Sequence, residues 1–143
     1  MLSQTAEYAL RAIVCLAEQP DRPLTGQQLA SRTRVPAGYL AKVMQALVRA
    51  SLVDAQRGKN GGFTLACAPA RMTILDVIRA VDANRRIRQC PLGLKGHERL
   101  CPLHRRLNEA LEHVERVFAE TRISDLLTAA PVKPLCEVAP AHA

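Results

Sequence analysis

The amino-acid sequence predicts a mainly helical protein with one small β-hairpin, and three observations support that fold class. Apolar residues recur at steps of three and four along much of the chain, which is the spacing of amphipathic helices. The dipeptide Asn60-Gly61 lies between two short β-prone runs, as is typical of a hairpin turn. Hydrophobic residues make up 48% of the chain but aromatic residues only 3%, so aliphatic side chains must fill the core, a composition that favours helix.

The chain has 143 residues, which suits one domain with an appended element, and a net charge of +7. Such a basic surface favours a polyanionic partner through charge attraction and counterion release. No apolar run is long enough to span a bilayer and residues 1–8 do not resemble a signal sequence, so we expect a cytoplasmic protein without a membrane partner. The five cysteines are irregularly spaced, which argues against a disulfide framework and leaves core packing, metal ligation or redox sensing.

Two helices are predicted at the start of the chain. Apolar residues at helical spacing predict a first helix from Thr5 to about Gln19, before Pro20. The run T-G-Q-Q at residues 25–28 fits a capping box, in which Thr25 caps a second helix and Gln28 bonds back to it. This second helix is expected to end at residue 31 or 32.

A third helix is predicted to follow a turn at residues 33–35 and to begin with Pro36 at its first position. One face is aliphatic and the other has small and basic residues. The inner residues are Leu40, Val43, Met44 and Leu47, and the outward residues are Ala37, Gly38, Lys42, Gln45 and Arg49. Two helices joined by a tight turn, the second with such an exposed face, are the pattern of a helix-turn-helix.

A β-hairpin is predicted directly after the third helix. Asn60-Gly61 suits a two-residue type I′ turn, because both central residues of that turn need positive φ. The strands are expected at residues 52–56 and 63–66, with Arg57 and Lys59 near the tip, where basic side chains can enter a minor groove or contact phosphates. A helix-turn-helix followed by a basic hairpin is a winged helix; the alternative is an unrelated hairpin after two helices.

The expected DNA-binding surface combines the third helix with the hairpin. Exposed residues at the N-terminal end of a recognition helix read base edges in the major groove, while basic side chains neutralise phosphates. The candidate DNA-binding residues are Gln28, Ala37, Gly38, Tyr39, Ala41, Lys42, Arg57 and Lys59, with packing at the edge of the core as the alternative role of Tyr39. The expected partner is double-stranded DNA with a palindromic operator.

The second half of the chain is predicted to contain two more helices. Thr73 and Asp76 form a second capping box, which opens a helix with Ile74, Val77, Ile78 and Val81 facing a core. From Pro102, apolar residues at positions 103, 107, 110, 114 and 117 follow the 3.5-residue repeat of a coiled-coil seam, which favours a homodimer interface over a single core-packed helix. The expected organisation is a winged helix-turn-helix domain at 1–82, a basic linker and Cys/His loop at 83–104, a dimerisation helix at 102–127 and a disordered tail at 128–143.

Residues 90–104 (C-P-L-G-L-K-G-H-E-R-L-C-P-L-H) concentrate soft donor atoms between the two halves. The donors are Cys90, His97, Cys101 and His104. Because this loop joins the DNA-binding half to the predicted dimer helix, a group bound there could couple one half to the other.

The chain resembles the winged-helix regulators that include IscR, the iron-sulfur cluster assembly regulator, and NsrR, the nitric-oxide sensor. The resemblance covers residues 3 to about 127. It lies in E-Y-A-L-R-A (7–12), G-Y-L-A-K-V (38–43), R-G-K-N-G-G-F-T-L-A (57–66), D-V-I-R-A-V-D (76–82) and C-P-L-H (101–104). It implies a homodimeric transcription factor, usually a repressor, whose DNA affinity responds to an iron-sulfur cluster that senses redox state, nitric oxide or iron-sulfur status.

The resemblance also suggests the ligands of a metal site. Cys90 matches the first cysteine of the family's loop, Cys101 the last, and His104 the histidine that follows, while Glu7 matches a position from which some members donate an acid across the dimer. No cysteine stands at the middle position, and His97 lies near it. Such mixed ligands favour a two-iron two-sulfur cluster over a four-iron four-sulfur cluster, because iron-sulfur centres accept histidine in place of cysteine.

Two alternatives to a cluster remain at the level of the sequence. Cys90 and Cys101 could form a reversible disulfide, or they could bind nothing while the regulator responds to another effector. An enzyme is not expected, because the sequence contains no nucleophile elbow, no phosphate-binding loop and no paired carboxylates beside a histidine at helical spacing.

Overall fold

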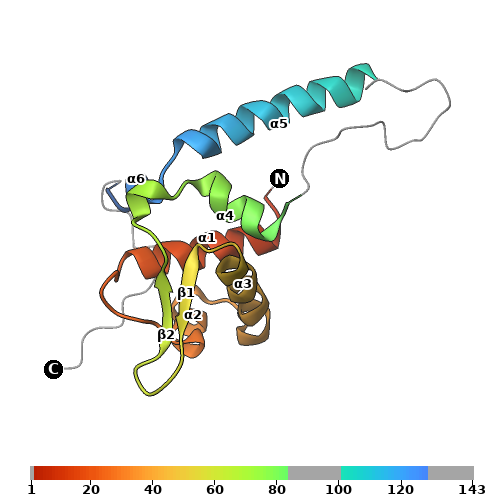
Figure 1. Cartoon of the computed structure of the whole chain (residues 1–143). Coiled ribbons are helices and arrows are strands. Elements are labelled where there is room, and N and C mark those ends of the chain that lie inside the picture. Colours follow the sequence, from red (N-terminus) through yellow and green to blue (C-terminus); the bar gives the residue numbers. More distant parts are fainter. Residues whose placement is uncertain (1, 84–100, 129–143) are drawn as a thin grey trace.

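The computed structural model describes residues 2–83 and 101–128, and it confirms a mainly helical fold with a two-stranded antiparallel hairpin (Figure 1). Residues 84–100 and 129–143, which include Cys90, His97 and the predicted tail, lie outside the described residues. None of the described helices is both long and apolar enough to cross a membrane. The elements in chain order are α1 (Gln4–Ala17), α2 (Gly26–Thr33), α3 (Ala37–Arg49), β1 (Val53–Gln56), β2 (Gly62–Leu65), the short 3-10 helix η1 (Pro69–Arg71), α4 (Ile74–Val81), α5 (Pro102–Glu120) and α6 (Ile123–Thr128).

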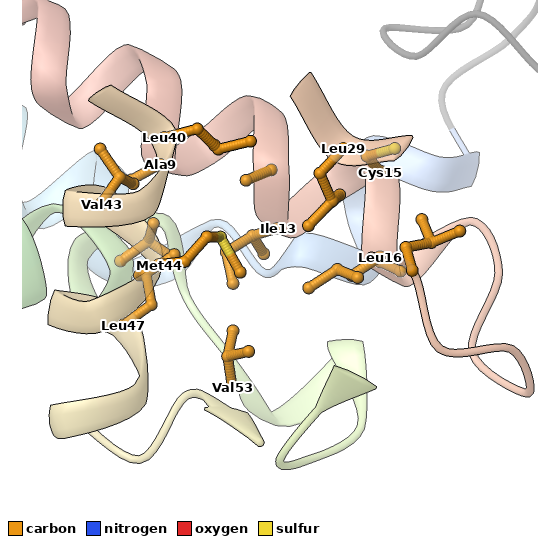
Figure 2. Packing of buried hydrophobic residues seen from close by; sticks show 14 of the residues in the cluster. Ala9, Ile13, Cys15, Leu16, Leu29, Leu40, Val43, Met44, Leu47 and Val53 are labelled. Atoms are coloured by element: carbon orange, nitrogen blue, oxygen red, sulfur yellow. The ribbon is translucent and has the colours of Figure 1, made fainter. Parts of the chain in front are cut away.

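Helix α1 is the centre of the core. The Ser3 hydroxyl caps it by accepting a hydrogen bond from the amide of Ala6 at 3.1 Å, and the helix ends at Ala17, two residues earlier than predicted. It contacts α2, α3, α4, α6 and β2. Aliphatic side chains of α2 and α3 gather around Ile13, which is fully buried (Figure 2). The aliphatic core expected from the composition is therefore organised around one helix.

The helix-turn-helix forms largely as predicted, with two differences at its turn. The Thr25–Gln28 capping box is present, but α2 continues to Thr33, and Arg34 then adopts a left-handed conformation with φ 56°. Pro36 is the N-cap residue of α3, and not its first helical residue as predicted. The predicted inner residues of α3 are all buried, and they are Leu40, Val43, Met44 and Leu47.

The hairpin pairs in a different register from the predicted two-residue turn. Gln56 lies opposite Gly62, so residues 57–61 form the loop, and positive φ occurs at Gly58 (109°) and Gly62 (151°), not at Asn60-Gly61. The amide of Phe63 donates to the carbonyl of Leu24 at 2.8 Å, and the amide of Leu24 donates back to Phe63 at 3.1 Å. A Cβ on Gly62 would lie 2.7 Å from the Leu24 carbonyl oxygen. This pairing with the segment before α2 accompanies the inclusion of Gly62 in the strand, opposite Gln56.

The C-terminal part is two helices, where a single helix at 102–127 was predicted. Helix α5 ends at Glu120, and residues 121–123 run antiparallel to residues 72–74, with the Ile123 amide donating to the Met72 carbonyl at 2.8 Å. The Ile123 side chain is fully buried in the core. Helix α5 therefore ends before this segment, because residues 121–123 pair with another segment and bury the Ile123 side chain instead of continuing the helix. In Figure 1, α4 lies between α1 and α5, and α5 contacts α4.

Candidate nucleic-acid interface and cluster site

The outward face of α3 carries the predicted recognition residues. All five of them on this helix are exposed, because the aliphatic stripe on the opposite face is buried against α1. They are Ala37, Gly38, Tyr39, Ala41 and Lys42. Figure 1 shows α3 and the hairpin loop on the side of the molecule away from α5. The recognition helix and the wing therefore lie on the same side of the molecule.

The first turn of α3 has a bare backbone. Among the described residues, no side chain caps this helix N-terminus, and the amides of Tyr39 and Leu40 donate to the Pro36 carbonyl. A Cβ built on Gly38 would meet no atom of the described part of the chain within 4 Å. The fold itself does not require glycine there, and a residue without a side chain lets another molecule approach the backbone closely.

Two predicted DNA-binding residues have partners within the protein. The Tyr39 hydroxyl lies 2.5 Å from the Thr5 hydroxyl, and the Tyr39 ring packs edge-on against Tyr8 with 5.4 Å between ring centroids. The Gln28 side-chain oxygen accepts the amide of Thr25 at 2.9 Å. Both residues thus have structural roles that a free surface residue would lack, while Tyr39 still keeps 39% of its surface exposed.

The wing presents two exposed cations, Arg57 and Lys59, on the loop at residues 57–61. A β-turn closes the loop, with the Gly61 amide donating to the Gly58 carbonyl at 3.0 Å. A Cβ on Gly61 would lie 2.5 Å from the Gln56 carbonyl oxygen, so the tight loop excludes a side chain at this position. The loop is therefore shaped by its glycines and charged by the residues between them, an arrangement suited to phosphate contacts.

At the start of α5, a thiol and an imidazole lie side by side. Cys101 is the N-cap residue of this helix, and its sulfur lies 2.9 Å from Nδ1 of His104. Both side chains are half-buried. Their spacing of three residues places them on one helical face at the first turn. Thiolate sulfur and imidazole nitrogen are both donors that iron-sulfur clusters accept, so this pair fits one half of a mixed-ligand site.

Glu7 does not join that pair in the described part of one chain. Its carboxylate Oε1 lies 2.5 Å from Nη2 of Arg11, an ion pair in which both side chains remain partly exposed. Among the described residues, no three His, Cys, Asp or Glu side chains gather into a group that could hold a metal ion. The remaining predicted ligand, Cys90, lies outside the described residues.

Two side chains of α1 that the sequence did not indicate as functional contact the helix-turn-helix. Thr5 and Arg11 of α1 contact opposite ends of the helix-turn-helix turn, Thr5 through Tyr39 and Arg11 through the carbonyl of Thr33, 3.4 Å away. The sequence showed only the local Glu7–Arg11 spacing, which predicted a solvated helical ion pair. The contacts with Thr33 and Tyr39 join residues 22 and 34 positions apart, for which the sequence contains no local signal.

Away from this surface, one carboxyl group at the end of α1 is electrostatically perturbed. Burial raises the pKa of Glu18, and the nearby positive charge of Arg32 partly offsets this effect. The buried Oε2 atom of Glu18 has no hydrogen-bond partner among residues 2–83 and 101–128. This group bears on stability and is not part of the recognition face.

Comparison with curated proteins identifies close relatives along almost the whole chain. The transcriptional regulator NsrR of Halalkalibacterium halodurans is 31% identical over 135 residues, which cover 89% of this chain and 90% of the relative. The transcriptional repressor NsrR of Streptomyces coelicolor is 29% identical over 140 residues, covering 94% and 92%.

Solved structures share the fold. IscR of T. potens superposes with a TM-score of 0.76 at 22% identity, covering 92% of this chain and 88% of that one. CymR, the global cysteine regulator of B. subtilis, superposes with a TM-score of 0.75 at 24% identity, covering 92% and 98%. The family model Rrf2, described as an iron-dependent transcriptional regulator, matches residues 2–129. The chain therefore belongs to the Rrf2 family of winged-helix transcriptional regulators.

Proposed function

We propose that this chain is a homodimeric repressor that binds a palindromic operator and whose affinity for DNA is controlled by an iron-sulfur cluster. The observation that carries the cluster proposal is the 2.9 Å contact between the Cys101 sulfur and His104 Nδ1. These two donors stand at the first turn of α5, at the junction between the segment leading from the winged helix and the proposed dimer helix.

DNA binding would use α3 and the wing together. Residues of the first turns of α3, among them Gly38 and Lys42, would lie against base edges in the major groove, and Arg57 and Lys59 would contact phosphates. Because phosphate contacts release condensed counterions, the affinity should fall steeply with salt. The net charge of +7 supports this mode of binding.

The proposed dimer interface is the apolar stripe of α5. Leu103, Leu107 and Val117 are 65%, 45% and 48% exposed in the single chain, although another face of the same helix packs on α4. Large exposed aliphatic side chains at coiled-coil spacing are stabilised by burial against a second helix. A two-fold dimer would present two recognition helices to half-sites about one helical turn, roughly 34 Å, apart.

Cys90, Cys101 and His104 of one subunit, with Glu7 of the second subunit, are the proposed ligands. When bound, a two-iron two-sulfur cluster supplies covalent bonds and charge that restrain the ligating side chains relative to one another. Glu7 belongs to α1, which packs directly on α2 and α3, and Cys101 begins α5. Ligation from both would set the spacing between the dimer helix and the recognition helices, so loss of the restraint changes operator affinity.

The test is anaerobic purification followed by visible absorption, iron assay and sulfide assay. Wild type and the matched control Cys67→Ala, which removes another free, half-buried thiol, should be coloured and contain stoichiometric iron and sulfide. Cys101→Ala should be colourless. Cluster-loaded and cluster-free protein should then differ in operator affinity by about 5- to 150-fold, the usual range of allosteric coupling. Equal affinity of the two forms would contradict cluster control.

A second candidate is a thiol switch, and the same contact favours it. In this version a two-electron oxidant such as a peroxide removes two electrons and the two thiol protons from Cys90 and Cys101, which then form a disulfide beside the imidazole of His104. This version predicts a colourless wild type that binds the operator in one thiol state only. Mass spectrometry of peptides from oxidised and reduced protein would identify the Cys90–Cys101 disulfide.

A further inference from the structure

We propose that three side chains of α1, Thr5, Tyr8 and Arg11, form a brace that positions the recognition helix. Tyr39 is the part of α3 that this brace holds, and its hydroxyl serves the protein rather than reading bases. Thr5, Tyr8 and Arg11 are accordingly positioning residues for operator recognition. The proposal rests on DNA binding by the winged helix and is independent of the cluster.

The brace contacts the first turn of α3 through Tyr39. The hydroxyl groups of Thr5 and Tyr39 lie 2.5 Å apart, and the rings of Tyr8 and Tyr39 meet at 84°, with centroids 5.4 Å apart. An edge-to-face pair has a defined orientation, and a hydrogen bond adds a directional restraint at the end of the same ring. Tyr39 is thus held at two points by a helix far from it in sequence.

The brace contacts the other end of the turn through Arg11. Its Nη1 donates to the carbonyl of Thr33 at 3.4 Å, and Thr33 is the last residue of α2. Carbonyl groups in the last turn of a helix lack intrahelical partners, so a cationic side chain there satisfies one and interacts favourably with the helix dipole. The Glu7 carboxylate holds the guanidinium from its other side.

Tyr8 joins the two halves of the brace. The guanidinium carbon of Arg11 lies 5.8 Å from the centroid of the Tyr8 ring, within the range of a cation–π contact, and the same ring packs against Tyr39. The same set of α1 side chains therefore contacts both the end of α2 and the start of α3, which are separated by residues 34–36.

This arrangement bears on the rotation of α3 about its own axis. The aliphatic stripe of α3 packs on the core through non-directional apolar contacts. Base recognition needs hydrogen bonds with well-defined distances and angles. Directional contacts at the exposed edge of α3, such as those of Tyr39, restrain that rotation.

The test is a double-mutant cycle on the hydrogen bond, read out by DNA binding. Thr5→Val and Tyr39→Phe each remove one hydroxyl and keep the shape of the side chain. Binding is measured by fluorescence anisotropy on an operator selected by the wild type from randomised duplexes, and on a scrambled duplex of equal length. Thr128→Val is the matched control, because the Thr128 hydroxyl donates to the carbonyls of Ser124 and Asp125 within α6 and contacts no part of the brace among the described hydrogen bonds.

We expect Thr5→Val and Tyr39→Phe each to weaken operator binding by about two- to tenfold, the range of one intramolecular hydrogen bond. The double variant should bind no more weakly than either single variant, because both lose the same interaction. Binding to the scrambled duplex and the base sequence preferred in selection should stay as in the wild type. Thr128→Val should bind like the wild type.

Other results would overturn the proposal. If Tyr39→Phe alone weakens binding and changes the selected base sequence, while Thr5→Val behaves as the wild type, the Tyr39 hydroxyl reads a base. Additive losses in the double variant would show that the two hydroxyls act separately. Wild-type affinity in all variants, or equal losses on the operator and the scrambled duplex, would leave only a contribution to general stability.

Discussion

Removal of the arginine on the wing should weaken DNA binding without changing the preferred sequence. Arg57 is exposed at the start of the loop at residues 57–61 and is therefore not part of the recognition helix α3. Each phosphate contact contributes about 0.9 to the slope of log affinity against log salt concentration on B-DNA. Arg57→Ala should therefore flatten that slope by about 0.9, and the affinity ratio of wild type to variant should shrink about 3.5-fold between roughly 50 and 200 mM salt.

The assay is a salt series of anisotropy titrations with operator and scrambled duplexes. Arg106→Ala is the control, because it removes the same charge from α5, where Arg106 is 83% exposed and pairs with Glu109 at 2.9 Å. Lys42→Ala, on the recognition helix, should instead reduce the preference for the operator over the scrambled duplex. Equal losses on both duplexes for Arg57→Ala and Lys42→Ala would refute this division of roles. An equally flattened slope in Arg106→Ala would show only a general charge effect.

Three further predictions concern stability and assembly. Ile123→Ala removes a fully buried side chain and should cost about 2–5 kcal/mol, seen as a thermal midpoint lower by about 6–15 °C in calorimetry; a small change would show that α6 is not part of the cooperative core. The raised pKa of Glu18 means that the folded state holds the Glu18 proton more tightly than the unfolded state does. The contribution of Glu18 to the free energy of unfolding is therefore most favourable below the ordinary glutamate pKa, and it is lost as pH rises through the pKa of the folded state. Glu18→Gln should thus raise the thermal midpoint near pH 7 but not near pH 4, and a gain of equal size at both pH values would contradict the assignment. Leu107→Glu places a charge in the proposed seam of α5 and should shift the mass in analytical ultracentrifugation from dimer to monomer, whereas Arg116→Glu, on an exposed position of the same helix, should not.

The thiol–imidazole pair and the DNA-binding surface differ in how far the sequence could predict them. Cys101 and His104 are three residues apart at the start of a helix, so local geometry alone brings them together, and the structure shows the contact. The same local geometry pairs Glu7 with Arg11. The hydrogen bond between the Thr5 and Tyr39 hydroxyl groups could not be predicted, because it depends on how α1 and α3 pack against each other in the folded protein.

The sequence by itself determined the elements whose bonds are local. The capping boxes at Thr25 and Thr73 join residues three positions apart, so the first turns of α2 and α4 follow from the residues alone. The buried stripe of α3 follows from apolar spacing on one helix, which needs only a core to face. The winged-helix class could be predicted because helix, turn and hairpin signals occur in that order.

Tertiary structure alone decided where long-range backbone pairing overrides local preference. Asn60-Gly61 favours a two-residue turn, but Phe63 pairs with Leu24 and Gly62 pairs with Gln56, so residues 57–61 form the loop. The pattern from Pro102 onward favours one helix, but residues 121–123 pair with residues 72–74 and bury Ile123. In both places the partner is distant in sequence, and the free energy of burial and of paired backbone exceeds the small local preference for a turn or a helix.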